Sequence, residues 1–277
     1  MPVGKQVING LRDGLRTLPY VGGKSNFGGA GEWISRVLAT KPVETYVEPF
    51  GGMCGILLRR HKARNEIVGD LDDRVVNFFR VVRDQPEELV ARLAVTAYAS
   101  ESEYAWAKAN LRHPVPVEQA VAVYIVLLNA MPASLIKRSV YQVGGKRKDW
   151  DLPEDVLHLS ERLRDVRFVT RDGIKLTQQF LGRSNTLIYI DPPYPGTLGY
   201  DHDVDLDALI SCISDRRRTA HVAVSGFADS YPSLEAAGFV RLVRNIHLQM
   251  EYPQDIRYQR RTEALYLTWN PQQTLDI

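Results

Sequence analysis

The chain of 277 residues contains few of the residues that cross-link a protein or bind metal ions. Its two cysteines, Cys54 and Cys212, are too few for a disulfide scaffold, which favours a reducing, intracellular compartment. The six histidines are scattered, and no zinc-ligand spacing, HExxH helix, GxSxG turn or Cys/His pair occurs. We therefore expect neither a metal site nor a nucleophilic side chain in the chemistry of this protein.

Long hydrophobic runs are also absent. The longest apolar stretch, Ala120 to Met131, is interrupted by Asn129 and is shorter than the roughly 20 residues that a membrane span needs. The first residues carry charges, including Lys5 and Arg12, with no apolar segment between them, so they do not resemble a secretory signal. The expectation is a cytoplasmic protein without membrane contact.

The formal net charge of +2 is too small to indicate a nucleic-acid partner by itself. The positive charge is nevertheless concentrated in three clusters, two of which are Arg216 to Arg218 and residues 257–261. Such clusters are either solvated surface or the means by which a polyanion is held beside a reactive site. The third cluster contains no acid and consists of Lys137, Arg138, Lys146, Arg147 and Lys148.

The pattern of apolar residues predicts strands and helices that alternate at both ends of the chain, with helices alone in between. Residues 45–83 read as two strand–helix units, the first helix starting at about Cys54, and the alternation resumes at residues 166–269. Residues 86–163 predict helices and a polar loop. We predict an α/β fold with a parallel sheet and a mainly helical insertion. The expected strands are residues 45–47, 66–69, 166–170, 186–190, 221–225, 240–246 and 264–269.

The tetrapeptide Asp191-Pro192-Pro193-Tyr194 directly follows the apolar strand predicted at residues 186–190. Open α/β sheets bind ligands beyond the carboxyl ends of their strands, so an acid and an aromatic ring at this place favour chemistry over packing. The prolines withhold backbone donors and leave carbonyl groups free to accept. Such a site suits a planar base with an exocyclic amine. The alternative is a strand end followed by an ordinary proline-rich turn.

A glycine-rich turn, residues 48–55, follows the first predicted strand and contains Gly51 and Gly52. Glycines allow backbone amides to approach a ligand at the start of a helix. Asp70 ends the next predicted strand, where an acid can accept from both hydroxyls of a ribose. Together they indicate a nucleoside-bearing cofactor, although a glycine turn alone is common in α/β proteins.

Two weaker signals lie elsewhere. Residues 19–25 superficially match a phosphate-binding loop, but Leu18 stands where that loop needs glycine and no strand precedes it, so an NTPase is excluded. Tyr20 can still cover a ring and Lys24 can meet a carboxylate or phosphate, unless this is a solvated loop. Asp172, after the strand at residues 166–170, is either an acceptor for an adenine amine or a helix N-cap.

These motifs together resemble those of the Dam-type DNA adenine-N6 methyltransferases, most closely the bacteriophage and prophage members. Residues 20–24 (YVGGK) resemble the family's N-terminal cofactor motif, residues 48–52 (EPFGG) its methionine-binding turn, and Asp70 its ribose-binding acid. Residues 191–194 (DPPY) match its catalytic motif in full. The cofactor motifs precede the insertion and the catalytic motif follows it, which is the order of the alpha group.

The resemblance implies a Rossmann-like methyltransferase sheet at residues 1–75 and 166–277, with a target-recognition insertion at 76–165 that holds double-stranded DNA. It implies transfer of a methyl group from S-adenosylmethionine to the N6 amine of a flipped adenine at a specific site, leaving S-adenosylhomocysteine, by a monomer or weak dimer. The implied catalytic residues are Asp191, Pro192, Pro193 and Tyr194. The implied cofactor-binding residues are Tyr20, Gly22, Gly23, Lys24, Glu48, Phe50, Gly51, Gly52, Asp70, Asp172 and Asp191. The implied DNA-binding residues are Lys137, Arg138, Lys146, Arg147 and Lys148.

Two positions depart from the family pattern. Tyr20 stands where tryptophan is frequent, and Cys54 stands where the turn usually has a further glycine, a change that can tighten the methionine pocket. The alternatives left open by the sequence are methylation of a cytosine N4 amine or of an RNA base, and a non-catalytic DNA-binding relative.

Overall fold

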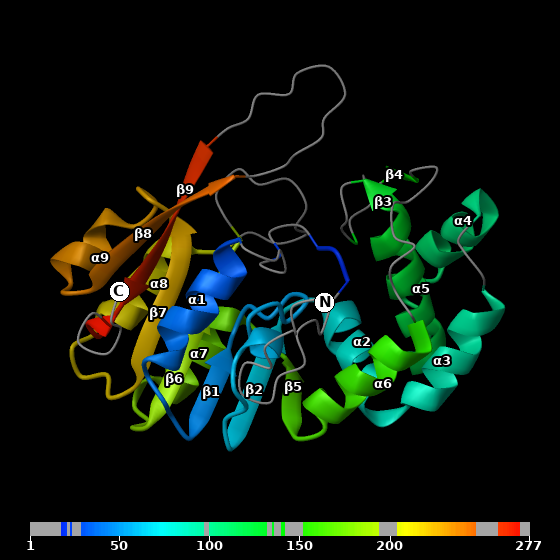
Figure 1. The fold of residues 1–277 in the computed structure, drawn as a ribbon, viewed down its shortest axis with the longest axis horizontal. Helices are drawn as coiled ribbons and strands as arrows, with labels where there is room; N and C mark the ends of the chain where they lie inside the picture. The colour runs from blue at the N-terminus through cyan, green and yellow to red at the C-terminus, as the bar shows by residue number, and fades with distance from the viewer. Residues whose placement is uncertain are drawn as a thin grey trace, which may run out of the picture.

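The structure of the protein, a computed structural model, describes residues 18–20, 23, 29–96, 100–131, 135, 140–141, 152–193, 204–247 and 260–271 (Figure 1). Its strands are β1 (Thr45–Glu48), β2 (Asn65–Asp70), β3 (Ala130–Met131), β4 (Val140–Tyr141), β5 (Val166–Thr170), β6 (Thr186–Ile190), β7 (His221–Phe227), β8 (Val240–His247) and β9 (Arg260–Leu267). Its helices are α1 (Ala30–Ala39), the 3-10 helix η1 (Leu57–Arg59), α2 (Asp73–Asp84), α3 (Pro86–Val95), α4 (Glu101–Ala109), α5 (Pro116–Asn129), α6 (Leu152–Leu163), α7 (Gly173–Leu181), α8 (Leu206–Ser214) and α9 (Pro232–Ala236).

Seven strands form one sheet in the order β5-β2-β1-β6-β7-β9-β8. The pairs from β5 to β7 are parallel, whereas β9 is antiparallel to both β7 and β8. The chain order of the parallel strands reverses between β1 and β6, which makes the carboxyl ends of these two strands the topological switch point of the sheet. The prediction of a Rossmann-like α/β sheet is therefore confirmed.

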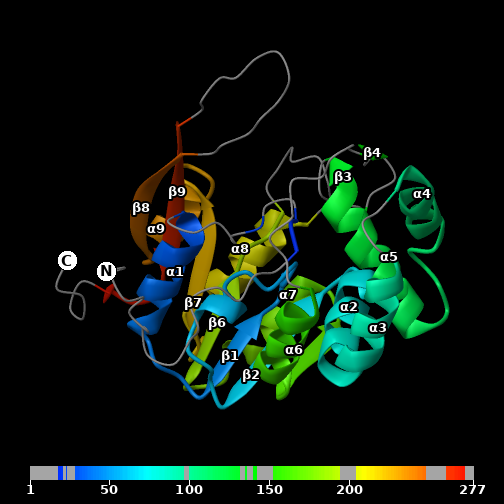
Figure 2. The same cartoon turned by 45° about the vertical axis from the view of Figure 1, so that its right-hand side comes forward.

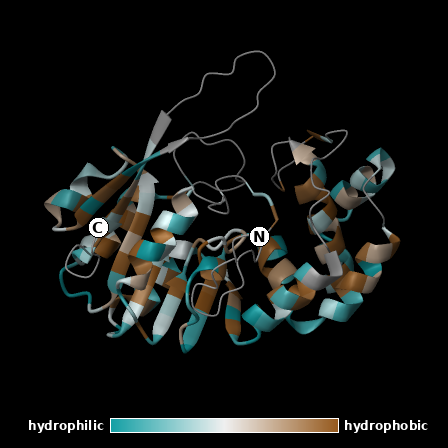
Figure 3. Ribbon diagram, in the orientation of Figure 1, coloured by the Kyte–Doolittle hydropathy of each residue, from teal (hydrophilic) through white to brown (hydrophobic). Residues whose placement is uncertain are grey.

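The side chains of each central strand alternate between two hydrophobic cores. On β6, Leu187 and Tyr189 pack in the core that also holds residues of α1, α2 and α5, whereas Ile188 and Ile190 pack with residues of α7, α8 and α9 on the other face. All five residues of β6 are buried, as expected for a parallel strand covered on both sides. Figure 3 shows hydrophobic residues along the strands and along α5.

The helices α2 to α6 lie together beyond the β5 edge of the sheet, opposite the β8–β9 edge (Figures 1 and 2). The ring of Phe79 in α2 stacks on Phe168 in β5, with centroids 5.4 Å apart and planes 8° apart. One continuous core contains sheet residues such as Val68 and residues of α2, α5 and α6. The inserted helices therefore share a hydrophobic core with the sheet. Within the described residues, no helix is long and apolar enough to cross a membrane.

The expected helix at Cys54 does not form. Cys54 has φ of +56°, a conformation in which an L residue cannot continue a helix, and only η1 follows the turn. The core beside it is instead filled by α1, a helix that precedes β1 in the chain and was not predicted; its buried Ile34 and Leu38 belong to the same cluster as Leu57 of η1.

Candidate functional site

Three carboxylates follow neighbouring parallel strands at the switch point. Glu48 ends β1, Asp70 ends β2 and Asp191 directly follows β6. Because β2, β1 and β6 are adjacent and parallel, their carboxyl ends meet at one edge of the sheet. The topology therefore brings the predicted cofactor motif and the predicted catalytic motif to one place, although more than 100 residues separate them in the chain.

The two glycines of the turn after β1 have different roles. Gly51 donates from its amide to the Gly69 carbonyl at 2.8 Å, and a Cβ at position 51 would lie 2.2 Å from Val68 Cγ1. Gly51 is thus needed for the turn to lie against β2. Gly52 has φ of +45°, and its missing Cβ would lie 3.5 Å from the ring of Tyr20. The turn therefore exposes the backbone of Gly52, and the aromatic ring of Tyr20 lies close to it.

Asp70 ties the turn after β1 to the loop after β2. Its Oδ2 accepts from the Gly52 amide and its Oδ1 from the Asp72 amide, both at 2.9 Å. Burial raises the pKa of the Asp70 carboxyl to about 6. A carboxylate has about four acceptor positions, so two amide bonds leave capacity for further donors. The arrangement fits a ligand with paired hydroxyl donors, such as a ribose.

Glu48 is fully enclosed beneath the turn. Its side chain is 2% exposed, and Tyr46 donates its hydroxyl to Glu48 Oε1 at 2.6 Å. Burial is the main cause that raises the pKa of Glu48 to about 7, and the negative charge of Asp191 adds to it. The guanidinium of Arg60 lies 3.8 Å from the centroid of the Tyr46 ring. Glu48 therefore belongs to a buried polar layer that continues below the candidate site.

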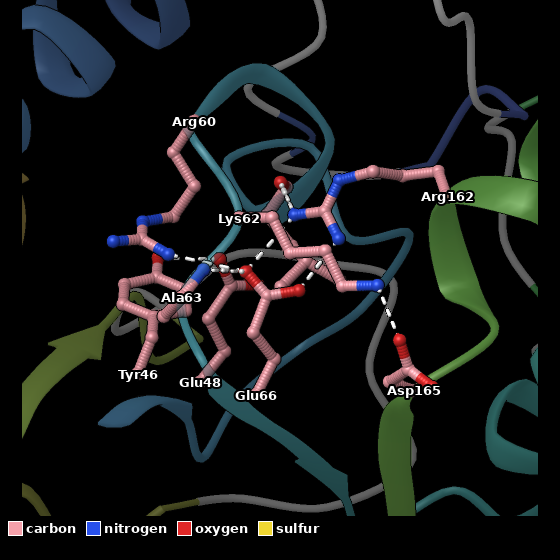
Figure 4. A network of polar contacts seen from close by, with 9 residues as sticks. Tyr46, Glu48, Arg60, Lys62, Ala63, Glu66, Arg162 and Asp165 are labelled. Carbon is pink, nitrogen blue, oxygen red and sulfur yellow. Dashed lines mark hydrogen bonds and ion pairs between the residues drawn. The ribbon is translucent and has the colours of Figure 1, made fainter. Parts of the chain in front are cut away.

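That layer is centred on Glu66 (Figure 4). Glu66 Oε1 accepts from Arg60 Nη1 at 3.2 Å and from the Ala63 amide at 3.0 Å. Arg162, in the last turn of α6, donates to both carboxylate oxygens at 2.5 and 3.0 Å, and to the Leu57 carbonyl of η1 at 2.8 Å. The inserted helices are thereby bonded to the segment that follows the glycine turn.

Asp191 is fixed from the neighbouring strand β7. Ser225 donates its hydroxyl to Asp191 Oδ1 at 2.7 Å, and Ser225 in turn accepts from the Tyr189 hydroxyl at 3.0 Å. Pro192 is buried and Pro193 is half-buried. Ser225 lies in the segment Val224-Ser225-Gly226-Phe227, which follows the order seen in phage-type members of the resembling family, but the sequence assigned no role to Ser225 or to Tyr189.

Phe50 packs against the start of α7 at Gly173, and Asp172 precedes that glycine. The ring of Phe50 occupies the space that a Cβ on Gly173 would fill, 2.3 Å from that position to Cζ. Asp172 Oδ1 accepts from the Lys175 amide at 2.9 Å, so Asp172 caps α7. The N-cap alternative is thus observed, and a contact of Asp172 with an adenine amine stays a prediction.

Several predicted site residues lie outside the described residues, and their roles stay predictions. They are Gly22 and Lys24 in the N-terminal motif, Tyr194 in the catalytic motif, and Lys137, Arg138, Lys146, Arg147 and Lys148 in the insertion. Gly23 is described, and its amide donates to the Tyr20 carbonyl at 2.9 Å.

The reversed strand order defines a Rossmann-like α/β protein, with the glycine turn and Asp70 at its switch point. A model of the D12 class N6 adenine-specific DNA methyltransferase family matches residues 20–203, more than half of the chain. The chain belongs to this family. It is an S-adenosylmethionine-dependent DNA methyltransferase that acts on adenine, which decides against the cytosine and RNA alternatives. No curated protein matches the chain.

Three solved structures with low similarity carry methyltransferase titles. Precorrin-6y C5,15-methyltransferase from Geobacter metallireducens GS-15 is 8% identical, with 84% of this chain and 85% of that chain covered and a TM-score of 0.38. Putative methyltransferase yhhF from Escherichia coli is 12% identical, with coverages of 91% and 98% and a TM-score of 0.36. A SAM-dependent methyltransferase from Agrobacterium tumefaciens is 13% identical, with coverages of 87% and 60% and a TM-score of 0.34. Such values support no functional conclusion.

The residues present fit S-adenosylmethionine, the cofactor of the family. The exposed backbone at Gly52 suits the amino-acid part of the cofactor, and the nearby ring of Tyr20 suits contact with a ring of the cofactor. The remaining acceptor capacity of Asp70 suits the hydroxyls of the ribose. In the part of the chain that the structure describes, no group of three or more His, Cys, Asp or Glu side chains is arranged to hold a metal ion.

Proposed function

We propose that this methyltransferase binds S-adenosylmethionine and an adenine flipped out of double-stranded DNA at the carboxyl ends of β2, β1 and β6, and methylates the adenine at a specific DNA site. The observation that supports this most is the convergence of the glycine turn, Asp70 and Asp191 at the switch point of the sheet. We further propose that it works in the cytoplasm of a bacterial or infected host cell, as a monomer or weak dimer.

The cofactor half of the proposed site is built on the turn after β1. The Gly52 backbone and the Asp70 carboxylate face the ligand, with Tyr20 beside them. When bound, S-adenosylmethionine supplies a methyl group on a positively charged sulfur. The residues that we propose to hold it are Tyr20, Gly22, Gly23, Lys24, Phe50, Gly51, Gly52, Asp70, Asp172 and Asp191, together with Glu48, which is enclosed and would act by supporting the turn from beneath.

The catalytic half orients an amine. The lone pair of the adenine N6 is delocalised into the ring, which makes this nitrogen a poor nucleophile. Hydrogen bonds from the amine to the Asp191 carboxylate and the Pro192 carbonyl would draw the nitrogen toward tetrahedral geometry. Alignment, more than base strength, then lowers the barrier. Tyr194 would stack on the flipped base. This contact would offset the free energy of unstacking, which is on the order of a few kcal/mol.

The remaining part of the proposal concerns DNA. We propose that residues 76–165 recognise the target, and that residues 1–75 and 166–277 form the catalytic domain. Lys137, Arg138, Lys146, Arg147 and Lys148 are proposed to contact phosphates or groove edges, on the family resemblance and their charge.

Replacement of Asp191 by alanine tests the catalytic role directly. Asp191→Ala should abolish methyl transfer to unmethylated genomic DNA, because the amine loses its main acceptor. S-adenosylmethionine binding by calorimetry should remain measurable. Asp207→Ala, a matched change on the exposed first turn of α8, should leave both quantities at the wild-type level. Undiminished transfer by Asp191→Ala would remove Asp191 from the mechanism.

A further inference from the structure

A chain of two hydrogen bonds leads through the protein interior to the Asp191 carboxylate. Tyr189 lies on β6 two residues before Asp191, and Ser225 lies on the adjacent strand β7. The Tyr189 hydroxyl is 3.0 Å from Ser225 Oγ, and Ser225 Oγ is 2.7 Å from Asp191 Oδ1. Tyr189 is 3% exposed and Ser225 is not exposed at all, so the bond between them is buried, whereas the bond to the half-buried Asp191 is partly buried.

The distances indicate the direction in which the two hydrogen bonds are donated, from Tyr189 to Ser225 and from Ser225 to Asp191. A serine hydroxyl has a single proton to donate. Ser225 Oγ is 2.7 Å from Asp191 Oδ1 but 3.4 Å from the Ile190 carbonyl, so its proton goes to the carboxylate, and a bond to a charged acceptor is the stronger kind. Ser225 then accepts from Tyr189. Donors linked in this way strengthen one another where water is excluded.

Ser225 is a fully buried polar residue in an otherwise apolar part of β7. Its neighbours on β7, Val222, Ala223 and Val224, are apolar and buried, and a hydroxyl costs free energy in such surroundings unless it is bonded. What Ser225 does in this position is hold one oxygen of Asp191.

We propose that Ser225 and Tyr189 are positioning residues of the methyl transfer, which fix the Asp191 carboxylate in the orientation that receives the adenine amine. This inference rests on the proposed function of Asp191. Ser225 acts on the carboxylate directly and Tyr189 acts through Ser225. Neither residue is proposed to touch the cofactor or the base.

The test measures the single-turnover rate of methyl transfer to unmethylated genomic DNA. Ser225→Ala removes a bond to a charged group, and the rate should fall about ten- to a hundredfold. Tyr189→Phe keeps the ring and should lower the rate by a smaller factor. The double variant should be no slower than Ser225→Ala, because Tyr189 acts only through the serine hydroxyl. Ser225→Thr, which retains a hydroxyl, should recover part of the rate.

Control measurements separate positioning from stability. Tyr266→Phe removes a tyrosine hydroxyl that donates to the Ala228 carbonyl at 2.9 Å, from the core on the opposite face of the sheet, and its transfer rate should be that of the wild type. The affinity for S-adenosylmethionine should stay unchanged in Ser225→Ala and Tyr189→Phe. If their rates fall only in proportion to lost affinity or lost folded protein, the positioning role is wrong.

The Asp191→Ala variant distinguishes this inference from the function beneath it. An active Asp191→Ala protein would overturn the proposed role of Asp191 itself. An inactive Asp191→Ala protein beside Ser225→Ala and Tyr189→Phe proteins with the rate of Tyr266→Phe would overturn the positioning role alone. Additive losses in the double variant would contradict the serial arrangement.

Discussion

Glu48 is a buried carboxyl group whose protonation should make the stability of the free protein depend on pH. Burial raises its pKa to about 7, from 4.5 for an exposed glutamate. The folded protein therefore binds this proton more tightly than the unfolded chain. The resulting stabilisation is complete below about pH 4.5 and is lost as the pH rises through 7, by about 3 kcal/mol for a shift of this size.

Glu48→Gln should remove this pH dependence, because the amide keeps an acceptor for Tyr46 and never ionises. Melting temperatures of the two proteins, measured without cofactor between pH 5 and pH 8, should diverge, with the wild type losing stability relative to the variant as the pH rises. Asp70, with its pKa raised to about 6, acts in the same direction in both proteins, so the difference isolates Glu48. If the melting temperatures of the two proteins change with pH in parallel, the pKa of Glu48 is not raised.

At the residue scale, candidate side chains could be predicted from the sequence where the residues next to them in the chain carry the signal. Asp70 and Asp191 were identified because each follows an apolar strand, a pattern visible within ten residues. The partners of Ser225 and Glu66 were not predicted, because they come from other strands or from α6, up to 96 residues away in the chain. A polar residue in a buried strand shows that a partner exists but not which residue it is.

The last turn of α6 is anchored by a buried ion pair, and breaking it should destabilise the protein. Arg162→Met leaves the Glu66 carboxylate without its bidentate partner and the Leu57 carbonyl without its donor. Both side chains of the pair are at most 6% exposed. Loss of one partner of a buried pair costs about 3–5 kcal/mol when the other charge is left unpaired. Because Glu66 keeps Arg60 as a partner, the cost should lie near the lower end of that range, and urea unfolding should still shift to a lower midpoint.

The chain offers a matched control for this anchor. Lys62 and Asp165 also form an ion pair, at 2.6 Å, between the segment before β2 and the segment after α6, but their side chains are 41% and 64% exposed (Figure 4). Lys62→Met should therefore cost about 1 kcal/mol or less. Equal losses for Lys62→Met and Arg162→Met would show that burial of the Arg162 pair adds nothing.

At the scale of elements, the seven predicted strands of the main sheet agree with the structure to within a few residues, because buried strands carry a strong apolar pattern. The prediction failed at the element after β1. The turn there has a non-glycine residue, Cys54, at positive φ, and helix α1 from upstream packs beside η1 in its place. The residues around the turn predict neither the positive φ of Cys54 nor that an upstream helix, α1, packs beside it.

At the scale of the molecule, the sheet and the inserted helices share one hydrophobic core. The cluster extends from Tyr46 and Leu187 in the central strands to Val121 in α5 and Leu163 in α6. The stacked pair Phe79 and Phe168 joins α2 to the edge strand β5. Recognition and catalysis, if divided between these parts as proposed, would take place on one packed body.

We expect DNA to approach the carboxyl ends of the parallel strands, because the proposed catalytic residues lie there, and we propose on charge and family resemblance that the basic cluster at residues 137–148 contacts it. Lys146→Gln/Arg147→Gln removes two charges from the insertion cluster. If both contact phosphates, the slope of log binding constant against log salt concentration should become shallower by about 2. Binding to a duplex of mixed sequence, measured over a range of salt concentrations, gives this slope.

Arg216→Gln/Arg217→Gln removes the same number of charges from a cluster that directly precedes β7, at the amino ends of the parallel strands. Because that end of the sheet is opposite the proposed site, the salt slope of this variant should equal that of the wild type. If the salt slope is unchanged for Lys146→Gln/Arg147→Gln, or becomes shallower by the same amount in both variants, the cluster at residues 137–148 does not bind DNA selectively and is ordinary solvated surface. A selective change would support the proposed contact of Lys146 and Arg147 with DNA phosphates.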